Sequence, residues 1–297
     1  MSKRIAVTGA SGFLGSFICR AAAVAGYQVV ALVRSTSKRD HIQDCVDQFV
    51  VGDQADPSCW PALIGDADCL IHNSFDWQAL KKSLQEHLTS NLLRSIELID
   101  AMAPRQCIFI SSVAVHHTIL SQWNGVIDPQ HPLRPGNLYG ACKAAIEAHL
   151  WASQNTSKQP ITIIRPAAVY GIDPNPARTI GHPIVQAMAN REAYERQGGG
   201  KFVHVEDVAD VVIKSIGNPE ADGAIFDMAD CYARWSDWAQ LTSEELNRED
   251  VIDHKSPEQS ANAFCKEAVR HLGVPMSRGI EGIRKHIREL IADAGHS

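Results

Sequence analysis

The sequence predicts an α/β protein with a doubly wound parallel sheet and a smaller, mostly C-terminal cap. The first observation is that short apolar runs alternate with segments of helical period from residue 5 to residue 228. Parallel sheets covered by helices on both faces show this alternation. The second is that from Cys231 onward the chain turns to short helical segments with more charge and tryptophan. A chain of 297 residues can bury a substantial core in one large domain or two smaller ones.

A glycine-rich turn, Thr8-Gly9-Ala10-Ser11-Gly12-Phe13-Leu14-Gly15, joins the first apolar run, Ile5–Val7, to an alanine-rich helix expected over residues 17–25. This order places free backbone N–H groups at a helix N-terminus, where about half a positive charge suits a pyrophosphate. Gly9 permits the turn, Gly12 lets the backbone approach the phosphates, and Gly15 allows close packing of helix and strand. The turn therefore predicts a Rossmann-type dinucleotide-binding domain.

The second apolar run, Gln28–Val33, ends in Arg34, and Lys38 and Arg39 follow closely. In a dinucleotide-binding βαβ unit, the residue that closes this strand faces the adenosine ribose, and an acidic residue there binds the 2′-hydroxyl of NAD. An arginine fork suits a phosphate instead. Arg34 therefore favours NADP as the cofactor, with NAD as the alternative. A solvated basic loop would explain the same residues without any ligand.

Polar residues follow several of the remaining apolar runs. Strands are expected over 48–51, 69–72, 107–110, 161–164, 201–205 and 224–228, and helices over 80–102, 139–154, 184–190 and 207–216. Ligands of doubly wound sheets lie at the carboxyl ends of the strands, so polar residues there are candidates for the site. They are Asp53 and Gln54, Asn73 and Ser74, and Ser111 and Ser112. Residues 117–137 are expected to form a loop over the site, and Gly198–Gly200 a flexible joint.

Tyr139 and Lys143 are four residues apart on an expected helix, so both project from one face. A free tyrosine ionises near pH 10 and is a poor base at neutral pH. A lysine cation close by favours the phenolate and is expected to lower that pKa by about 1–3 units. Tyr139 can then exchange a proton with a hydroxyl or carbonyl oxygen, which Ser112 holds by a hydrogen bond. Hydride transfer to or from a nicotinamide would complete the reaction.

At this point the sequence resembles the extended short-chain dehydrogenase/reductases, in their epimerase/dehydratase-like branch. The resemblance covers most of residues 4–230. It rests on the glycine-rich turn, Gly52-Asp53, Ser111-Ser112, Tyr139-Gly140-Ala141-Cys142-Lys143, Arg165-Pro166-Ala167-Ala168-Val169-Tyr170-Gly171 and Phe202-Val203-His204-Val205-Glu206-Asp207-Val208-Ala209.

The resemblance implies roles for particular residues. Tyr139 is the catalytic acid/base, Lys143 binds the nicotinamide ribose, and Ser112 is the third catalytic member. Asp53 lies near the adenine, and the backbone from Pro166 to Val169 lies beside the nicotinamide. Together with the turn, the predicted cofactor-binding residues are Gly9, Ser11, Gly12, Phe13, Leu14, Gly15, Arg34, Asp53, Gln54, Asn73, Ser74, Ser111, Tyr139, Lys143, Pro166 and Val169. Members commonly form homodimers through two helices, here the segments around 88–101 and 139–153.

Departures from the family pattern bear on the substrate. Dehydratases carry an Asp-Glu pair after the catalytic hydroxyl residue, where this chain has Val113-Ala114. Sugar-nucleotide epimerases place an asparagine at Ala168 and a diphosphate-binding arginine at Gly200. Their absence removes charge-assisted contacts normally worth ~1.5–3 kcal/mol each. Arg178 and Arg191 are alternative cationic partners. Three aromatic residues are expected either to line an apolar pocket or to belong to the core, namely Phe75, Trp77 and Trp123.

Three functions are consistent with these residues. The preferred hypothesis is an NADP(H)-dependent oxidoreductase that transfers a hydride between nicotinamide and a small or apolar carbonyl or alcohol. The first alternative is a nucleotide-sugar epimerase that retains its NAD(P). The second is a non-catalytic NADP-binding regulator, which the presence of Ser112, Tyr139 and Lys143 disfavours.

The composition limits the kinds of partner that the chain is expected to bind. The net charge of −6 gives no support for nucleic-acid or anionic-membrane binding, and no segment has the roughly 20 apolar residues that span a bilayer. Eight scattered cysteines, and residues 1–4 running directly into a strand, favour a cytoplasmic protein without a targeting segment. No metal site is expected, although His116 and His117 are adjacent. The expected domains are 1–165 with a return segment at about 201–230, and a substrate-binding cap from 166–200 and 231–297.

Overall fold

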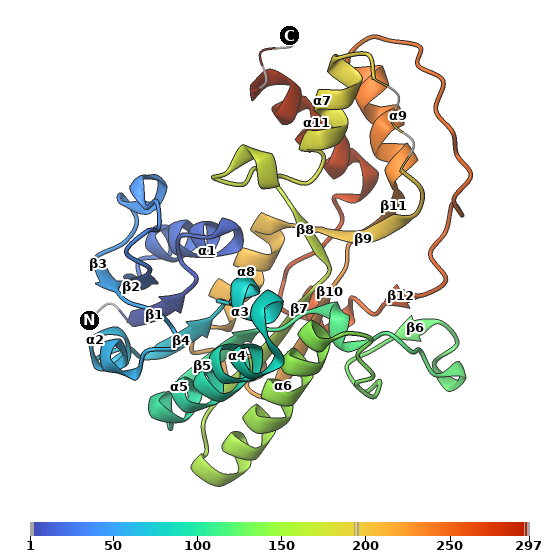
Figure 1. Cartoon of the computed structure of the whole chain (residues 1–297). Coiled ribbons are helices and arrows are strands. Elements are labelled where there is room, and N and C mark those ends of the chain that lie inside the picture. The colour runs from blue at the N-terminus through green and yellow to red at the C-terminus, as the bar shows by residue number, and fades with distance from the viewer. Residues whose placement is uncertain (1–2, 193, 195, 294, 296–297) are drawn as a thin grey trace.

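A computed structural model describes residues 3–192, 194, 196–293 and 295 of the chain. Its centre is a seven-stranded, wholly parallel sheet in the order β10-β7-β5-β4-β1-β2-β3 (Figure 1). The strands are β1 (Arg4–Thr8), β2 (Gln28–Val33), β3 (Gln48–Val51), β4 (Cys69–His72), β5 (Gln106–Ile110), β7 (Ile161–Pro166) and β10 (Ala224–Met228). The doubly wound α/β fold predicted from the sequence is confirmed.

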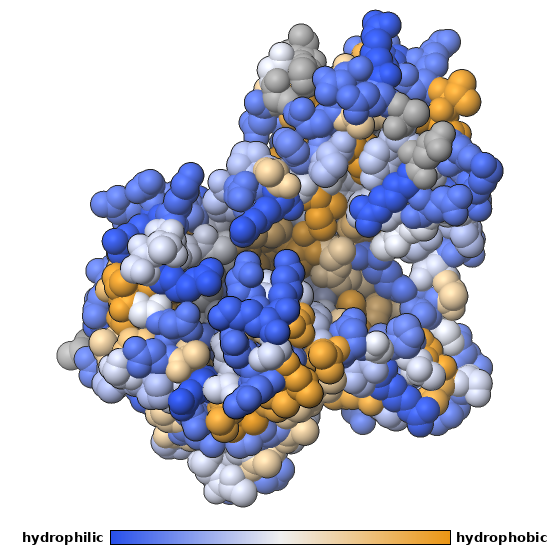
Figure 2. All heavy atoms as spheres, in the orientation of Figure 1, coloured by the Kyte–Doolittle hydropathy of each residue, from blue (hydrophilic) through white to orange (hydrophobic). Residues whose placement is uncertain are grey.

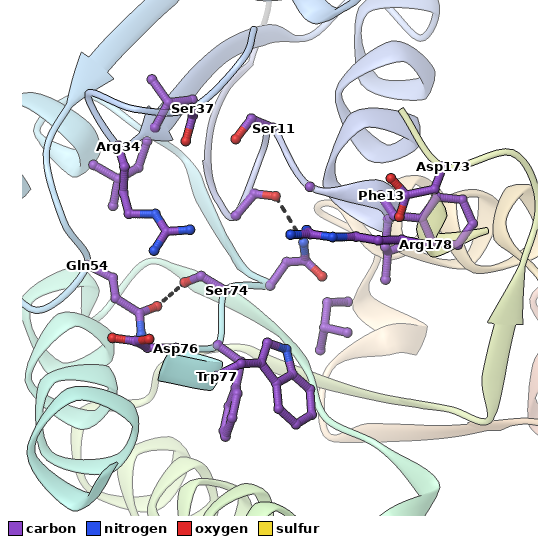
Figure 3. A pocket seen from close by; sticks show the side chains of 18 of the residues that line it. Ser11, Phe13, Arg34, Ser37, Gln54, Ser74, Asp76, Trp77, Asp173 and Arg178 are labelled. Atoms are coloured by element: carbon purple, nitrogen blue, oxygen red, sulfur yellow. Dashed lines mark hydrogen bonds between the residues drawn. The ribbon is translucent and has the colours of Figure 1, made fainter. Parts of the chain in front are cut away.

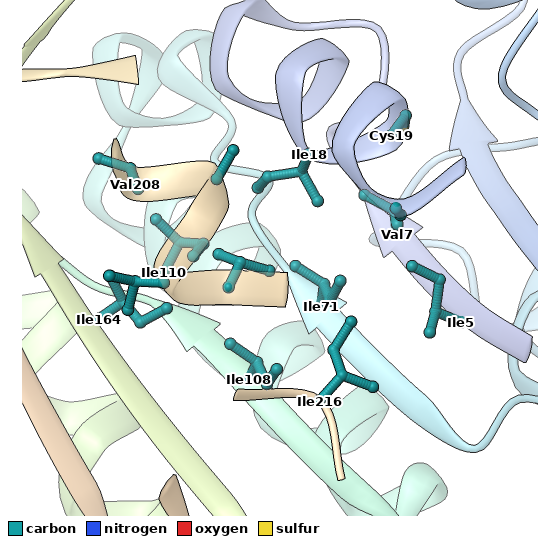
Figure 4. Close-up of a cluster of buried hydrophobic side chains, with 14 of the residues drawn as sticks. Ile5, Val7, Ile18, Cys19, Ile71, Ile108, Ile110, Ile164, Val208 and Ile216 are labelled. Carbon is teal, nitrogen blue, oxygen red and sulfur yellow. The ribbon is translucent and has the colours of Figure 1, made fainter. Parts of the chain in front are cut away.

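Helices cover both faces of this sheet. Side chains of a strand point alternately to its two faces, so Ile5 and Val7 of β1 join one buried cluster and Ala6 joins the other. The first cluster contains α1 (Phe13–Val24), α8 (Val205–Ser215) and α10 (Glu267–His271) (Figure 4). The second contains α2 (Trp60–Ile64), α5 (Arg94–Met102) and α6 (Leu138–Ser157). Apolar side chains and helices therefore exclude water from both faces of the sheet.

The segment expected as one helix over 80–102 is broken. It consists of α3 (Trp77–Lys82), α4 (Leu84–His87), a π-helical turn (Leu88–Leu93) and then α5. Ser83 adopts an extended conformation, and its hydroxyl accepts a hydrogen bond from the backbone N–H of Glu86. A serine that caps a helix start in this way interrupts the helix before it. The break leaves α3 beside the carboxyl end of β4.

A cap stands on the carboxyl edge of the sheet (Figure 1). It holds a three-stranded sheet of β8 (Ala168–Tyr170), β9 (Gly199–His204) and β11 (Cys231–Arg234), with α7 (His182–Ala189), α9 (Trp235–Glu245) and α11 (Gly279–Asp293). The expected flexible joint at Gly198–Gly200 is wrong in part, because Gly199 and Gly200 pair with Arg234 and Ala233 in the ladder between β9 and β11.

The division into a dinucleotide-binding part and a cap remains a proposal, with one departure from the expected bounds. The cap was expected to include all of 231–297. Within that range, α10 and the residues after it pack on the central sheet, where Val269, Val274 and Met276 are fully buried. The expected loop over 117–137 contains β6 (Val126–Ile127), which pairs with β12 (Ala263–Phe264). Among the described residues, no helix combines the length and hydropathy needed to cross a membrane.

Candidate active site

A cavity of about 700 Å³ lies at the carboxyl ends of the central strands. Figure 2 shows a hollow between the cap and the sheet, with apolar residues on its floor. With the exception of Gly15, every predicted site residue lines this cavity: Gly9, Ser11, Gly12, Phe13, Leu14, Arg34, Asp53, Gln54, Asn73, Ser74, Ser111, Ser112, Tyr139, Lys143, Pro166 and Val169. Gly15 is buried in α1, where an added Cβ would collide with the carbonyl oxygen of Gly9. Its place fits the expected packing role.

The glycine-rich turn has the geometry of a phosphate cradle. Gly9 has a φ of +67°, and Gly12 donates to the carbonyl oxygen of Gly9 at 3.1 Å. The helix begins at Phe13, earlier than residue 17, where it was expected. Gly12 stands at its N-cap, and no side chain caps it. Backbone N–H groups of the first turn consequently point to the cavity without a side-chain partner.

The end of the cavity where the adenosine is expected, called here the adenosine end, is exposed and basic. Arg34, Thr36, Ser37 and Lys38 line it after the end of β2 (Figure 3). Arg34 and Lys38 have no ion-pair partner among the described residues, which leaves both cations available to a ligand. Sequence reasoning missed His41, which also lines the cavity and whose Nε2 contacts the carbonyl oxygen of Ser11 at 3.2 Å.

The catalytic candidates meet at the other end of the cavity. The Nζ atom of Lys143 donates to the carbonyl oxygen of Ile110 at 2.7 Å and lies 4.6 Å from the centroid of the Phe109 ring. Burial lowers the pKa of Lys143 to about 8. Burial also raises the pKa of Tyr139, against a hydrogen bond with Ser112 that lowers it. The expected lowering of the Tyr139 pKa by Lys143 is wrong here, because desolvation outweighs other effects.

Two aromatic rings cover Tyr139. The ring of Trp77 stacks on it at 4.9 Å with an interplanar angle of 26°, and the ring of Phe75 meets it edge-on at 4.8 Å. Both line the cavity, whereas Trp123 packs against His131 in the 117–137 segment. The pocket hypothesis therefore holds for two of the three aromatic residues. Their apolar surface excludes water from one side of the phenol.

Behind the catalytic candidates lies a buried charge network that sequence reasoning missed. Arg165, only 2% exposed, binds Glu147 at 2.7 Å and Asp227 at 3.4 Å. It also donates to Nε2 of His116 at 3.2 Å, so that ring nitrogen must accept. Burial raises the pKa of Asp227 to about 6 and lowers that of His116 to about 4. Ser111 donates to Glu147 and thereby connects the network to the cavity wall.

The structure places the two missing substrate anchors on adjacent cap strands. Ala168 begins β8 and is paired with Phe202 of β9, two residues beyond Gly200. A Cβ at Gly200 would lie 3.2 Å from the Phe202 ring, so a larger side chain there would require the ring to shift by a few tenths of an ångström. Of the two alternative cations, Arg178 lines the cavity together with Asp173 and Asn175, and Arg191 does not.

Residues 5–229 match the model of the NAD dependent epimerase/dehydratase family. The chain belongs to this family. Its members are NAD(P)-dependent enzymes of the extended short-chain dehydrogenase/reductase type, as the sequence predicted.

Among the family's curated members, the dTDP-L-rhamnose 4-epimerase of Burkholderia thailandensis is 26% identical, over 95% of this chain and 90% of that protein. The ceramide reductase of Caulobacter vibrioides is also 26% identical, over 69% of this chain and 58% of that protein. Among solved structures, the UDP-glucose 4-epimerase of Thermus thermophilus in complex with NAD superposes with a TM-score of 0.78 at 18% identity, covering 97% of this chain and 98% of that one. At 18% identity, the similarity to the UDP-glucose 4-epimerase structure shows the fold alone.

The residues present fit the dinucleotide that the family requires. An uncapped helix N-terminus, a glycine turn with a positive φ and an exposed arginine line one continuous cavity. These features suit a pyrophosphate and an adenosine ribose. The described residues contain no cluster of three or more His, Cys, Asp or Glu that would hold a metal, and all eight cysteines are free thiols. With a nicotinamide bound, the chemistry that these residues would offer is proton transfer at Tyr139.

Proposed function

We propose that this chain is a nucleotide-sugar epimerase that retains its NAD(P) through the reaction. The observation that carries this proposal is the match to a dTDP-L-rhamnose 4-epimerase over 95% of the chain, which includes the cap as well as the dinucleotide-binding sheet. The reductases among the relatives match over 68% to 81% of the chain. Because the cavity of this chain lies between the sheet and the cap, similarity in the cap bears on the proposed substrate class. The alternative from the sequence thus becomes the preferred function.

The proposed role of Tyr139 is to accept and return one proton. When bound, a nicotinamide would supply the hydride chemistry at the substrate carbon, first as acceptor and then as donor. Tyr139 would act in its ionised form, which its raised pKa makes scarce at neutral pH, and would accept the proton of the hydroxyl on that carbon as the carbon becomes a carbonyl. When the hydride returns to the opposite face, Tyr139 gives the proton back and the inverted alcohol results. Ser112 would hold the substrate oxygen through both steps, and Lys143 would bind the nicotinamide ribose.

A second function, NADPH-dependent reduction of a small or apolar carbonyl compound, is favoured by two observations. Arg34 and Lys38 form a basic adenosine end that suits the 2′-phosphate of NADP. Trp77 and Phe75 make the surroundings of Tyr139 apolar, and Ala168 and Gly200 supply no charge to a sugar diphosphate. In this reaction the cofactor is consumed in each turnover and must leave the protein.

Product analysis separates the two functions. The purified protein is incubated with dTDP-, UDP- and GDP-hexoses without added reductant, and epimers are detected by NMR. In parallel, oxidation of added NADPH is followed by absorbance with a panel of aldehydes and ketones. Epimer formation without net cofactor consumption is the expected result, and Tyr139→Phe should abolish it. Stoichiometric NADPH oxidation with a carbonyl, and no epimer from any hexose, would establish the second function instead.

A cytoplasmic location and a homodimer also remain proposals. Support for the dimer comes from exposed leucines on the segment that the family uses, because Leu88 is 41% and Leu93 is 48% exposed on the outer surface beside α5. Sedimentation of the purified protein would decide the oligomeric state.

A further inference from the structure

Arg178 is a cation in the cavity that comes from the cap. It ends a short 3₁₀ turn (Pro176–Arg178) between β8 and α7, and it lines the same cavity as the glycine-rich turn. Figure 3 shows its side chain extending from the cap segment into the cavity, in the region of Phe13. No carboxylate of the described residues forms an ion pair with it.

The backbone that carries Arg178 is firmly held, although the side chain is exposed. The N–H of Asp173 donates to Oγ1 of Thr179 at 3.0 Å, and Thr179 is buried. The N–H of Asn175 donates to Oδ1 of Asp173 at 2.7 Å, and the N–H of Arg178 donates to the carbonyl oxygen of Asn175 at 2.9 Å. The segment therefore presents the guanidinium from a fixed base.

The same segment starts against the first residue of α1. A Cβ added to Gly171 would lie 3.4 Å from the Cζ atom of Phe13. Gly171 therefore lies beside the N-terminus of α1, and from there the chain runs back over the cavity, where it places Arg178. Two sources of positive charge, the helix N-terminus and this guanidinium, border one space. The carboxylate of Asp173, in the same segment, already accepts the Asn175 N–H.

We propose that Arg178 binds the pyrophosphate of the bound dinucleotide and thereby ties the cap to the cofactor. A diphosphate is the chemistry that an arginine fork and an uncapped helix N-terminus recognise together. The inference rests on the dinucleotide binding of the family and not on the proposed epimerisation. Its consequence is retention, because the cofactor must break a contact with the cap before it leaves. An enzyme that returns its hydride to the same substrate needs this slow release.

Calorimetry and stopped-flow fluorescence of the full-length protein test the assignment without turnover. Arg178→Gln should weaken NAD and NADP by the same factor, roughly tenfold or more, since a hydrogen bond to a charged group is lost from both. Release of NADH and NADPH should accelerate by a similar factor, and Arg178→Lys should restore part of the affinity. Adenosine should bind the variant as it binds the wild type. Arg270→Ala, which removes an exposed arginine of α10 outside the cavity, is the matched control.

Three outcomes would overturn the assignment. Unchanged affinity and release for both cofactors would show that Arg178 is a solvated side chain. A loss confined to NADP would place it on the 2′-phosphate. Unchanged cofactor binding combined with weaker binding of UDP or dTDP to the cofactor-loaded protein would place it on a substrate diphosphate. Because none of these measurements requires turnover, failure of the proposed function leaves the test of Arg178 intact.

Discussion

The two ends of the cavity are built in opposite ways. At the adenosine end, Arg34 and Lys38 are exposed cations with no ion-pair partner in the part of the chain that the structure describes, and the turn offers backbone N–H groups. At the catalytic end, Lys143 and Arg165 are 3% and 2% exposed; Lys143 donates to a backbone carbonyl, and Arg165 pairs with two carboxylates. Buried charges cost stability unless they are paired, whereas exposed ones cost little. We infer that the adenosine end is built for affinity, and the catalytic end for holding charged groups in fixed positions.

The largest expected effect is at the catalytic end. Tyr139→Phe should lower turnover by roughly 100- to 10,000-fold, because the phenol that exchanges the substrate proton is removed. Cofactor affinity should change little, since the adenosine end is untouched. Steady-state kinetics and calorimetry on the same preparation measure both quantities. Near-normal turnover of the variant would disprove the assignment of Tyr139, and Lys143→Ala, which should reduce turnover and cofactor affinity together, is the comparison variant.

Removal of the central arginine of the buried network should affect stability. Arg165→Ala leaves Glu147 and Asp227 as buried carboxylates without their cation, so the free energy of unfolding should fall by about 3–5 kcal/mol. Arg284→Ala is the control, because it breaks more exposed ion pairs with Glu244 and Glu245 and should cost no more than ~1 kcal/mol. Urea unfolding of both variants decides the matter. Equal losses would mean that the buried network contributes no more to stability than a more exposed ion-pair cluster of the cap.

The pH dependence of the unfolding free energy tests the burial of the cation at the catalytic end. Burial lowers the pKa of Lys143 from 10.5 to about 8. Between these values the unfolded chain holds the proton and the folded chain does not, so the free energy of unfolding rises with pH across this window. The wild type should therefore gain about 3 kcal/mol relative to Lys143→Met between pH 8 and pH 10.5. Urea unfolding of both proteins at the two limits measures the gain; parallel pH profiles would contradict the buried cation.

The smallest expected effect is at the adenosine end. Arg34→Asp should reverse a preference for NADP, with a loss of roughly tenfold or more in NADP affinity, and leave the unfolding free energy within ~0.5 kcal/mol. Arg39→Ala is the matched control, because Arg39 lies over the Phe49 ring outside the cavity. Calorimetry with both cofactors gives the ratio. Equal affinity of the wild type for NAD and NADP would show that Arg34 is a solvated strand end.

Local patterns explain how much of the fold was predictable. The bounds expected for β2, β3, β4 and β10 agree with the structure, because a buried parallel strand is a short apolar run with clear ends. The break at Ser83 was missed, since the leucine and isoleucine period of 80–102 continues across a single capping hydroxyl. Gly199 and Gly200 lack strand propensity and are held in β9 by their partners on β11.

The candidate site was predictable where the backbone determines it. The glycine turn and the polar strand ends come together because parallel strands end at one edge of a sheet. Contacts between side chains that are far apart in the sequence could not be predicted from residue spacing. The stacking of Trp77 on Tyr139 depends on how α3 returns after β4, and the pairing of Arg165 with Asp227 joins residues 62 positions apart. The direction of the Tyr139 pKa shift was missed for the same reason, because burial is a property of the folded chain.

The path of the chain between sheet and cap limits how the protein can be divided or moved. It crosses from β7 to β8, back from β9 to α8, out again from β10 to β11, back from α9 to β12 and α10, and out a last time from α10 to α11 (Figure 1). No single cut releases the cap as a continuous piece, so exchange of caps between relatives would require several matched junctions. A body tethered at several points also cannot swing freely on one hinge. Opening of the cavity would therefore be a small tilt of the cap, shared among all its connections.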